Sequence, residues 1–179
     1  MDRDDELMMA YAEGDPFAFA ELYDRHADAV YGFCLRRLGE EAAAADVLQE
    51  TFRRLVDARD RFEPRGRFRS YLFTLARSAC VDDVRSRRAD ERLEELRQEG
   101  FQPESADPAP GSRLETEEQL RRLLALLTEE QREVLILAKY HGFPHAEIAE
   151  MTGATEAAVK QKVYRALRRL RQAVGEERS

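Results

Sequence analysis

The last quarter of the sequence carries side chains suited to hydrogen bonding with a polyanion. The stretch EIAEMTGATEAAVKQKVYRALRRLR, from Glu147 to Arg171, predicts two helices joined by a turn at Gly153. Ala149 precedes that glycine by four positions and Val159 follows it by six, which is the spacing at which the helices of a helix-turn-helix cross. The predicted chemistry is recognition of base edges and phosphates in duplex DNA by the second helix.

The second helix of this motif places its basic and amide side chains away from its apolar positions. Arginine can pair with guanine, and glutamine with adenine, through two hydrogen bonds in the major groove. We expect base contacts from Lys160, Gln161, Tyr164, Arg165 and Arg168. We expect phosphate contacts from Thr155, Lys162, Arg169 and Arg171. The alternative is an amphipathic helix with a solvated basic face, and the matching spacing of the small residues favours DNA recognition over it.

A second basic segment, RFEPRGRFR from Arg61 to Arg69, mixes arginine with aromatic rings. Its proline and glycine predict a loop, and rings beside arginines in a loop suit stacking on unpaired bases. We therefore expect single-stranded nucleic acid to contact Arg61, Phe62, Arg65, Arg67, Phe68 and Arg69. The alternative is that the rings belong to the core and the arginines keep the loop soluble, and it stays open above all for Tyr71 and Phe73.

Charge is distributed in blocks along the chain. The 179 residues carry a net charge of -7, yet residues 51–88 carry +6 and residues 154–179 carry +4, whereas residues 1–50 carry -9. Binding of a polyanion depends on the local field and not on the total charge. The acidic composition is therefore compatible with nucleic-acid binding by the two basic segments.

Helical periodicity predicts an all-α scaffold that positions both basic segments. DPFAFAELYDRHADAVYGFCLRRLG begins with Asp15 as an expected N-cap, has Pro16 at its first turn and ends at Gly39. EEAAAADVLQETFRRLVDAR and SYLFTLARSACVDDVRSRR continue with apolar residues at helical spacing, and strand signals are nearly absent. Thr128 is the expected cap of a later helix, and His26 is expected at a helix edge.

The segment FQPESADPAPGS holds three of the six prolines and has no periodicity, which is typical of a flexible linker. We expect two small helical domains, residues 1–97 and 114–179, joined by an acidic, proline-rich linker at residues 98–113. Neither domain could bury enough apolar surface unless its helices pack as a compact bundle.

Several function classes receive no support from the sequence. No apolar run is long enough to span a membrane, and the acidic N-terminus lacks the features of a signal peptide, so we expect a cytoplasmic protein without membrane insertion. Cys34 and Cys80 lie among apolar residues and are expected to be buried free thiols. His141 and His145 are separated by GFP, which does not suit helical metal ligation, so neither a metal nor a cofactor is expected.

The motifs, in their order, resemble the extracytoplasmic-function sigma factors of bacterial RNA polymerase. GDPFAFAELYDRH followed by DVLQETF is similar to the start of that family's first conserved domain, region 2. FRSYLFTLARSACVDDVRSRR resembles its promoter-melting helix. LTEEQREVLILAKYHGFPHAEIAEMTGATEAAVKQKVYRALRRLR resembles its second conserved domain, region 4. Together these stretches cover nearly the whole chain except the linker.

The resemblance implies an alternative sigma factor that binds core RNA polymerase and promoter DNA. It implies that the clamp of the largest polymerase subunit contacts Asp46, Gln49, Glu50 and Arg53. It also implies binding to the flap of the second-largest subunit, reading of the −10 element as a single strand by Arg61–Arg69, and reading of the −35 element by the terminal helix. An anti-sigma factor is a further partner that the resemblance allows. The sequence departs from the family pattern with Tyr71 in place of tryptophan, Ser78 in place of asparagine, and Ala158 in place of threonine or serine.

Two other readings of the sequence are weaker. An autonomous helix-turn-helix regulator would need a ligand pocket or a dimer face in the N-terminal unit, and it has no use for a second basic segment with aromatic rings. An enzyme is not expected, with no catalytic residues to propose, because no phosphate-cradling glycine motif, HExxH motif or nucleophile elbow is present.

Overall fold

The computed structural model describes residues 2–97 and 112–176. Within these ranges the backbone forms helices and no strand, which confirms the predicted all-α class. None of the described helices combines the length and the apolar character needed to cross a lipid bilayer. The elements, in chain order, are α1 (Arg3–Ala12), α2 (Pro16–Leu38), α3 (Glu41–Asp57), η1 (Arg59–Arg61), α4 (Phe68–Arg97), α5 (Ser112–Ala125), α6 (Glu129–Leu135), η2 (Ile136–Tyr140), α7 (His145–Thr152) and α8 (Glu156–Glu176).

The helix ends follow the local signals in the sequence. The Asp15 carboxylate accepts a hydrogen bond from the Phe17 amide at 2.9 Å, and Gly39 ends α2 with a φ of 76°, a left-handed conformation that favours glycine. Thr128 begins α6 in a capping box with Gln131. Each of these predicted caps is therefore confirmed.

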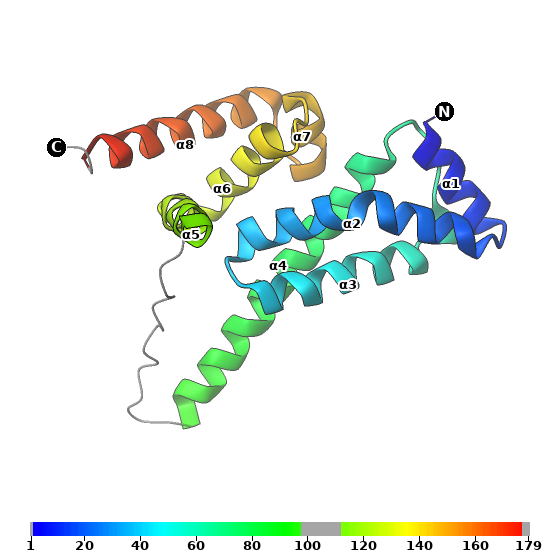
Figure 1. The fold of residues 1–179 in the computed structure, drawn as a ribbon, viewed down its shortest axis with the longest axis horizontal. Coiled ribbons are helices and arrows are strands. Elements are labelled where there is room, and N and C mark those ends of the chain that lie inside the picture. Colours follow the sequence, from blue (N-terminus) through cyan, green and yellow to red (C-terminus); the bar gives the residue numbers. More distant parts are fainter. Residues whose placement is uncertain (1, 98–111, 177–179) are drawn as a thin grey trace.

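The first four helices form one bundle (Figure 1). Helix α2 packs against α3 and α4, and α1 lies across the bundle beside η1. Buried side chains such as Leu22, Phe33 and Leu72 fill the centre. Cys34 and Cys80 are buried free thiols, as predicted, with their sulfur atoms 3.9 Å apart. The second half of α4 extends away from the bundle and is largely exposed.

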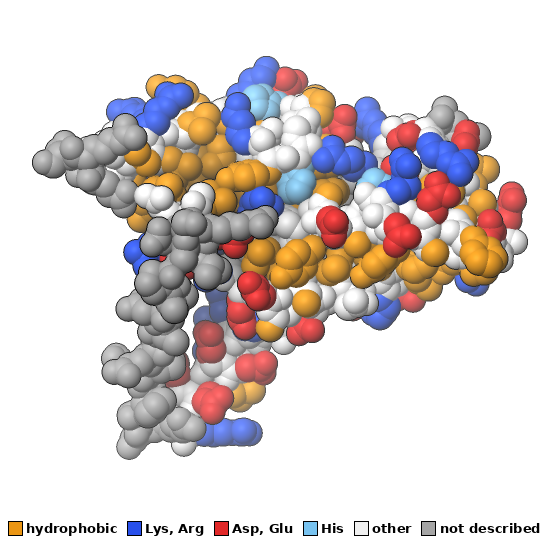
Figure 2. Space-filling view, viewed as in Figure 1, with side chains coloured by type: hydrophobic (Ala, Val, Ile, Leu, Met, Phe, Trp, Pro, Cys, Tyr) orange, Lys and Arg blue, Asp and Glu red, His pale blue; other side chains and the backbone are white. Residues whose placement is uncertain are grey.

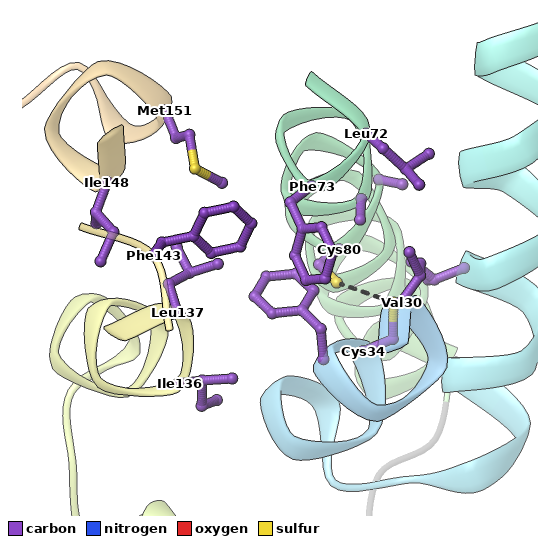
Figure 3. Close-up of a cluster of buried hydrophobic side chains, with 14 of the residues drawn as sticks. Val30, Cys34, Leu72, Phe73, Cys80, Ile136, Leu137, Phe143, Ile148 and Met151 are labelled. Carbon is purple, nitrogen blue, oxygen red and sulfur yellow. Dashed lines mark hydrogen bonds between the residues drawn. The ribbon is translucent and has the colours of Figure 1, made fainter. Parts of the chain in front are cut away.

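The remaining helices form a second group, in which α6 and α7 both pack on α8. The chain passes from α6 through one π-helical turn, η2, before the loop that leads to α7. This group packs on the first bundle through contacts of α7 with α4 and of α6 and η2 with α2. Figure 3 shows Phe143 and Met151 on one side facing Phe73 on the other. The buried side chains of both groups form one hydrophobic cluster.

His26 is buried in the bundle, not at a helix edge, because its Nε2 lies 2.8 Å from the Asp4 carboxylate and its ring packs on Phe68. The predicted linker at residues 98–113 falls almost entirely outside the described residues, which resume at Ser112 with α5. The boundaries of the two domains therefore stay a prediction.

Candidate nucleic-acid interface

The terminal motif has the geometry of a helix-turn-helix. Helix α7 ends at Gly153, whose φ of 68° turns the chain sharply before α8 begins. Ala149 and Val159 are buried where the two helices cross, as their spacing predicted. The Thr155 hydroxyl accepts the Ala158 amide at 3.1 Å and so caps α8.

The outer face of α8 is open to solvent. Tyr164 is 63% exposed, and the other predicted base-contact residues, Lys160, Gln161, Arg165 and Arg168, are exposed as well. Lys160 pairs with Glu156 within the helix at 2.8 Å, and Lys162 pairs with Glu130 of α6 at 2.7 Å. Among the predicted phosphate contacts, Thr155, Arg169 and Arg171 are exposed too. We call this outer surface the α8 face.

Residues 62–67 of the arginine-rich segment form a loop that helix α1 contacts, whereas Arg61 ends η1 and Phe68 and Arg69 begin α4. Gly66 has a φ of 67°, and its amide donates a short hydrogen bond to the Asp5 carboxylate. Asp5 is fully buried, and its other oxygen, Oδ1, has no hydrogen-bond partner. The adjacent Asp4 pairs with Arg25 at 2.7 Å and with His26. Asp5 therefore ties the loop to the first turn of α1, and Asp4 ties the same turn to α2.

A cavity of about 360 Å³ lies beside this loop. We call it the loop pocket. On the side of the first bundle it is lined by Asp5, Arg61, Phe62, Glu63, Arg65, Arg67, Ser70, Tyr71 and Thr74. The rings of Phe62 and Tyr71 lie 5.5 Å apart, and burial raises the pKa of the Tyr71 hydroxyl, which therefore stays protonated. Half-buried rings beside exposed arginines can stack on an unpaired base.

Phe68 corrects the expectation drawn from the composition of the loop. Its side chain is fully buried, packed on the rings of His26 and Phe62. It opens α4 with its ring directed into the core, so in this structure it is not available for stacking on a base. Phe62 remains half-buried and Arg61, Arg65 and Arg67 are exposed, whereas Arg69 lies at the contact with the second group of helices.

The predicted polymerase-binding residues lie along α3. Asp46, Gln49 and Arg53 are exposed, and Glu50 is half-buried. Hydrogen bonds from Arg53, and then from Arg54, lower the pKa of Glu50 to about 2. Arg54 also contacts Ser78 and Asp82 of α4, at 3.1 Å and 2.8 Å. Glu50 thus joins α3 to α4 through an arginine, while Asp46 and Gln49 carry the more accessible polar groups.

Helix α7 covers one side of the loop pocket. Glu147, Glu150 and Met151 complete its lining. Arg67 pairs with Glu150, and the Ser70 hydroxyl donates to Glu147. Arg69 donates to the carbonyl oxygen of His141 at 2.7 Å and lies over the Phe143 ring at 4.3 Å.

Sequence analysis did not find these covering residues, nor Asp5. No local pattern marks them, because their partners lie 61 to 83 positions away along the chain. Within the described ranges, no group of histidine, cysteine, aspartate or glutamate side chains is arranged to hold a metal ion.

Comparison with known proteins gives the family. The model of Sigma-70 region 2 matches residues 22–90, and the model of Sigma-70 region 4 matches residues 117–170. The first match runs from within α2 to within α4 and includes the loop, and the second runs from within α5 to within α8.

Individual proteins are similar along most of the chain. RNA polymerase sigma factor CarQ of Myxococcus xanthus is 31% identical over 94% of this chain and 96% of its own. ECF RNA polymerase sigma factor SigL of Mycobacterium tuberculosis is 34% identical over 84% and 85%. CnrH, solved in complex with the cytosolic domain of CnrY, superposes with a TM-score of 0.75 at 28% identity, covering 98% of this chain and 99% of CnrH. The chain belongs to the extracytoplasmic-function sigma factors of the sigma-70 family.

Proposed function

We propose that this chain directs core RNA polymerase to promoters, with residues 1–97 binding the polymerase and the −10 element and residues 114–179 binding the −35 element. The observation that carries the proposal is the presence, in one chain, of two unlike arginine-rich surfaces. The α8 face suits the major groove of a duplex, and the loop pocket suits an unpaired base. A protein that opens DNA at one end of its site and reads duplex at the other needs both.

The −35 element is assigned to the α8 face. Gln161 and Arg165 are one turn apart on its exposed surface and have the side chains that pair with adenine and guanine. Arg169 and Arg171 are assigned to phosphates. The flap of the second-largest polymerase subunit is the expected protein partner of this domain.

The −10 element is assigned to the loop pocket, with Phe62 stacking on a base and Arg61, Arg65 and Arg67 neutralising the phosphates around it. The phenol of Tyr71 takes the place of the family's usual tryptophan and presents a smaller ring. We expect weaker melting than a tryptophan would give, because the stacking area is smaller.

The clamp of the largest subunit is assigned to α3. Figure 2 shows hydrophobic side chains running along the face where α2 and α3 lie, with charged side chains beside them. An apolar stripe bracketed by exposed polar groups such as Asp46 and Gln49 is a suitable surface for a partner helix. Because this chain superposes on CnrH, which was solved in complex with the cytosolic domain of CnrY, an anti-sigma factor is also a proposed partner. We expect this chain to act with the polymerase in the cytoplasm.

Transcription in vitro tests the function. Purified core polymerase is assayed on a promoter library with and without the chain, and we expect a discrete set of promoters to be used only when it is present. Gln49→Ala combined with Asp46→Ala should weaken binding to core polymerase while circular dichroism stays unchanged. DNA binding in the absence of polymerase that suffices to regulate a promoter would support an autonomous regulator and contradict the proposal.

A further inference from the structure

We infer, on the basis of the proposed function of the loop pocket, that Asp5 of α1 makes this pocket selective for cytosine or adenine. These two bases carry an amino group at the position where uracil and guanine carry a carbonyl oxygen. The amino group donates a hydrogen bond to Oδ1 of Asp5. Thymine and uracil present an oxygen there and are bound less tightly.

Asp5 lies at the floor of the loop pocket. Its side chain lines the cavity and is fully buried, whereas Arg61, Arg65 and Arg67, which line the same cavity, are exposed. The rim of the pocket is therefore basic and suits the phosphates of a strand, while the floor holds a carboxyl group. A nucleotide whose phosphates contact the rim brings its base toward this floor.

The two carboxyl oxygens of Asp5 differ in their contacts. Oδ2 accepts a hydrogen bond from the Gly66 amide, whereas Oδ1 is buried and has no hydrogen-bond partner among the described residues. Buried polar atoms without a partner are rare in folded proteins. Because such an atom is unfavourable, a ligand that donates to Oδ1 gains binding free energy that a ligand with an acceptor in the same place does not.

The other polar groups along the wall are already engaged within the protein. The Thr74 hydroxyl donates to the Ser70 carbonyl oxygen at 2.8 Å, and the Ser70 hydroxyl donates to Glu147. Glu63, at the exposed rim, pairs with Arg65. Among the described side chains that line the pocket, Asp5 is therefore the one with a buried oxygen that lacks a partner.

Two rings orient the base relative to this oxygen. Phe62 and Tyr71 are half-buried in the wall of the pocket, with ring centroids 5.5 Å apart. A base that stacks on such rings presents its edge, and not its face, to the polar groups around it. Proteins that bind an unstacked base commonly read its Watson–Crick edge in this way. The amino groups of cytosine and adenine lie on that edge.

The position of Oδ1 is held from two sides. The Gly66 amide binds the other oxygen of the same carboxyl group. The adjacent Asp4 pairs with Arg25 at 2.7 Å and lies 2.8 Å from Nε2 of His26, which ties the first turn of α1 to α2. An acceptor fixed in this way is preorganised for one hydrogen-bond pattern.

Selectivity follows from the cost of a mismatch. Carboxylate side chains accept hydrogen bonds from the amino group of cytosine in protein–DNA complexes. Uracil has the same ring, but it would place its O4 oxygen against Oδ1, so that two acceptors face each other. A site built to hydrogen-bond one group discriminates against an analogue that lacks it, because the buried polar atom of the site is left unpaired.

Asp5→Asn tests the inference, because it changes the hydrogen-bonding pattern and keeps the shape of the side chain. The carbonyl oxygen of asparagine can still accept the Gly66 amide, and its amide nitrogen then places a donor where Oδ1 lies. Such a donor favours the O4 oxygen of uracil. A purely structural role of Asp5 predicts weaker binding of every base alike, whereas base recognition predicts an exchange of preference.

The measurement uses the full chain in the polymerase holoenzyme and bubble templates of a promoter that the factor recognises. Each position of the single-stranded −10 segment carries in turn deoxycytidine, deoxyuridine, deoxyadenosine or deoxyinosine, and equilibrium binding gives the affinity for each. The position whose base occupies the loop pocket is the one at which base identity no longer matters in Phe62→Ala. Circular dichroism establishes that each variant is folded.

Two variants are matched controls for the loss of a carboxyl group. Asp4→Asn changes the neighbouring buried residue, which does not line the pocket. Glu63→Gln changes an exposed residue that does line it. Where Asp5→Asn does not fold, Asp5→Ala replaces it and should abolish the preference without reversing it.

At the Phe62-dependent position we expect the unaltered factor to bind deoxycytidine about tenfold more tightly than deoxyuridine, and deoxyadenosine about tenfold more tightly than deoxyinosine. Asp5→Asn should reverse both preferences, and both controls should keep them. A preference of the unaltered factor for deoxyuridine and deoxyinosine would overturn the inference, as would a preference that survives in the Asp5 variant or is lost equally in the controls. A Phe62-dependent position without preference within either pair would overturn it while leaving the proposed function standing. Absence of any Phe62-dependent position would overturn both.

Discussion

The loop pocket and the α8 face are both rich in arginine and both predicted to bind DNA, yet the fold treats them differently. The α8 face is the outer side of a regular helix, and the residues predicted to contact bases are exposed to solvent. The loop pocket is formed by an irregular segment. The Asp5 carboxylate binds this segment through the Gly66 amide, and α7 covers one side of the pocket.

The difference reflects the two ligands. A duplex presents a rigid groove, so a preformed helix is enough to read it. A single strand is flexible, and its bases bind in a pocket whose walls must be fixed by other elements. Such a pocket also offers a surface that an acidic helix of the same chain can occupy, whereas a convex helix face does not. Variants at the two surfaces test this contrast.

Phe68 and Phe62 separate the core of the loop from its ligand surface. Phe68→Ala removes a fully buried ring and should lower the free energy of unfolding by about 3–5 kcal/mol. Phe62→Ala removes a half-buried ring and should weaken single-strand binding by about 1–3 kcal/mol with a smaller effect on stability. Denaturant unfolding and anisotropy measure the two effects, and equal loss of stability in both variants would contradict the assignment.

Asp5 tests whether α1 positions the loop. Asp5→Ala removes the acceptor of the Gly66 amide at a fully buried position and should cost about 1–3 kcal/mol of unfolding free energy. Single-strand binding should fall with it. Glu6→Ala, at a half-exposed position of the same helix, is the control and should be nearly neutral. The prediction fails if the two substitutions have the same effect on strand binding.

Arg165 and Arg171 test readout by the α8 face. Arg165→Ala should cost about 1–3 kcal/mol at one base pair of the −35 element and relax the preference there. Arg171→Ala should weaken all promoters alike and lower the salt slope by about one. Holoenzyme binding to singly substituted −35 elements across a salt series distinguishes them. Uniform loss in both variants would make the α8 face an electrostatic clamp without base readout.

His141 should make the packing of the second group of helices on the first bundle sensitive to acid. Burial, and then the charges of Arg69 and Arg36, lower its pKa to about 4, and its ring packs on Phe33 and Phe73 of the other domain. When the two groups of helices separate, His141 becomes exposed and its pKa returns to about 6.5. The separated form therefore binds more protons than the packed form below that pH. The packing of the two groups of helices on one another is therefore most favourable above pH 6.5 and weakens as the pH falls toward 4.

The ratio of molecules whose two groups of helices are separated to molecules in which they are packed should rise about tenfold as the pH falls from 7.5 to 5.5. The radius of gyration across this range measures it. His141→Phe keeps an aromatic ring at the contact and should reduce the dependence on pH. An unchanged dependence in that variant would assign the effect to other groups.

The sequence alone predicted the helices from α2 to α8 but not α1, several helix ends, and the two arginine-rich segments proposed to bind DNA. Asp15, Gly39 and Thr128 act on the backbone within a few residues, so their roles can be predicted without the fold. The helix-turn-helix was equally predictable, because the spacing of Ala149, Gly153 and Val159 is a local property.

Tertiary structure decided which predicted residues are available to a ligand. Phe62 and Phe68 are the same residue type in one short segment, and packing alone puts the second in the core. Asp5 reaches Gly66 across 61 positions, and Glu133 reaches Arg37 across 96. Contacts at such separations depend on how whole helices pack, and helix packing is set by the sum of many apolar contacts and not by any short motif. For this reason the sequence identified two arginine-rich surfaces, and only the fold determined that one is open and the other covered.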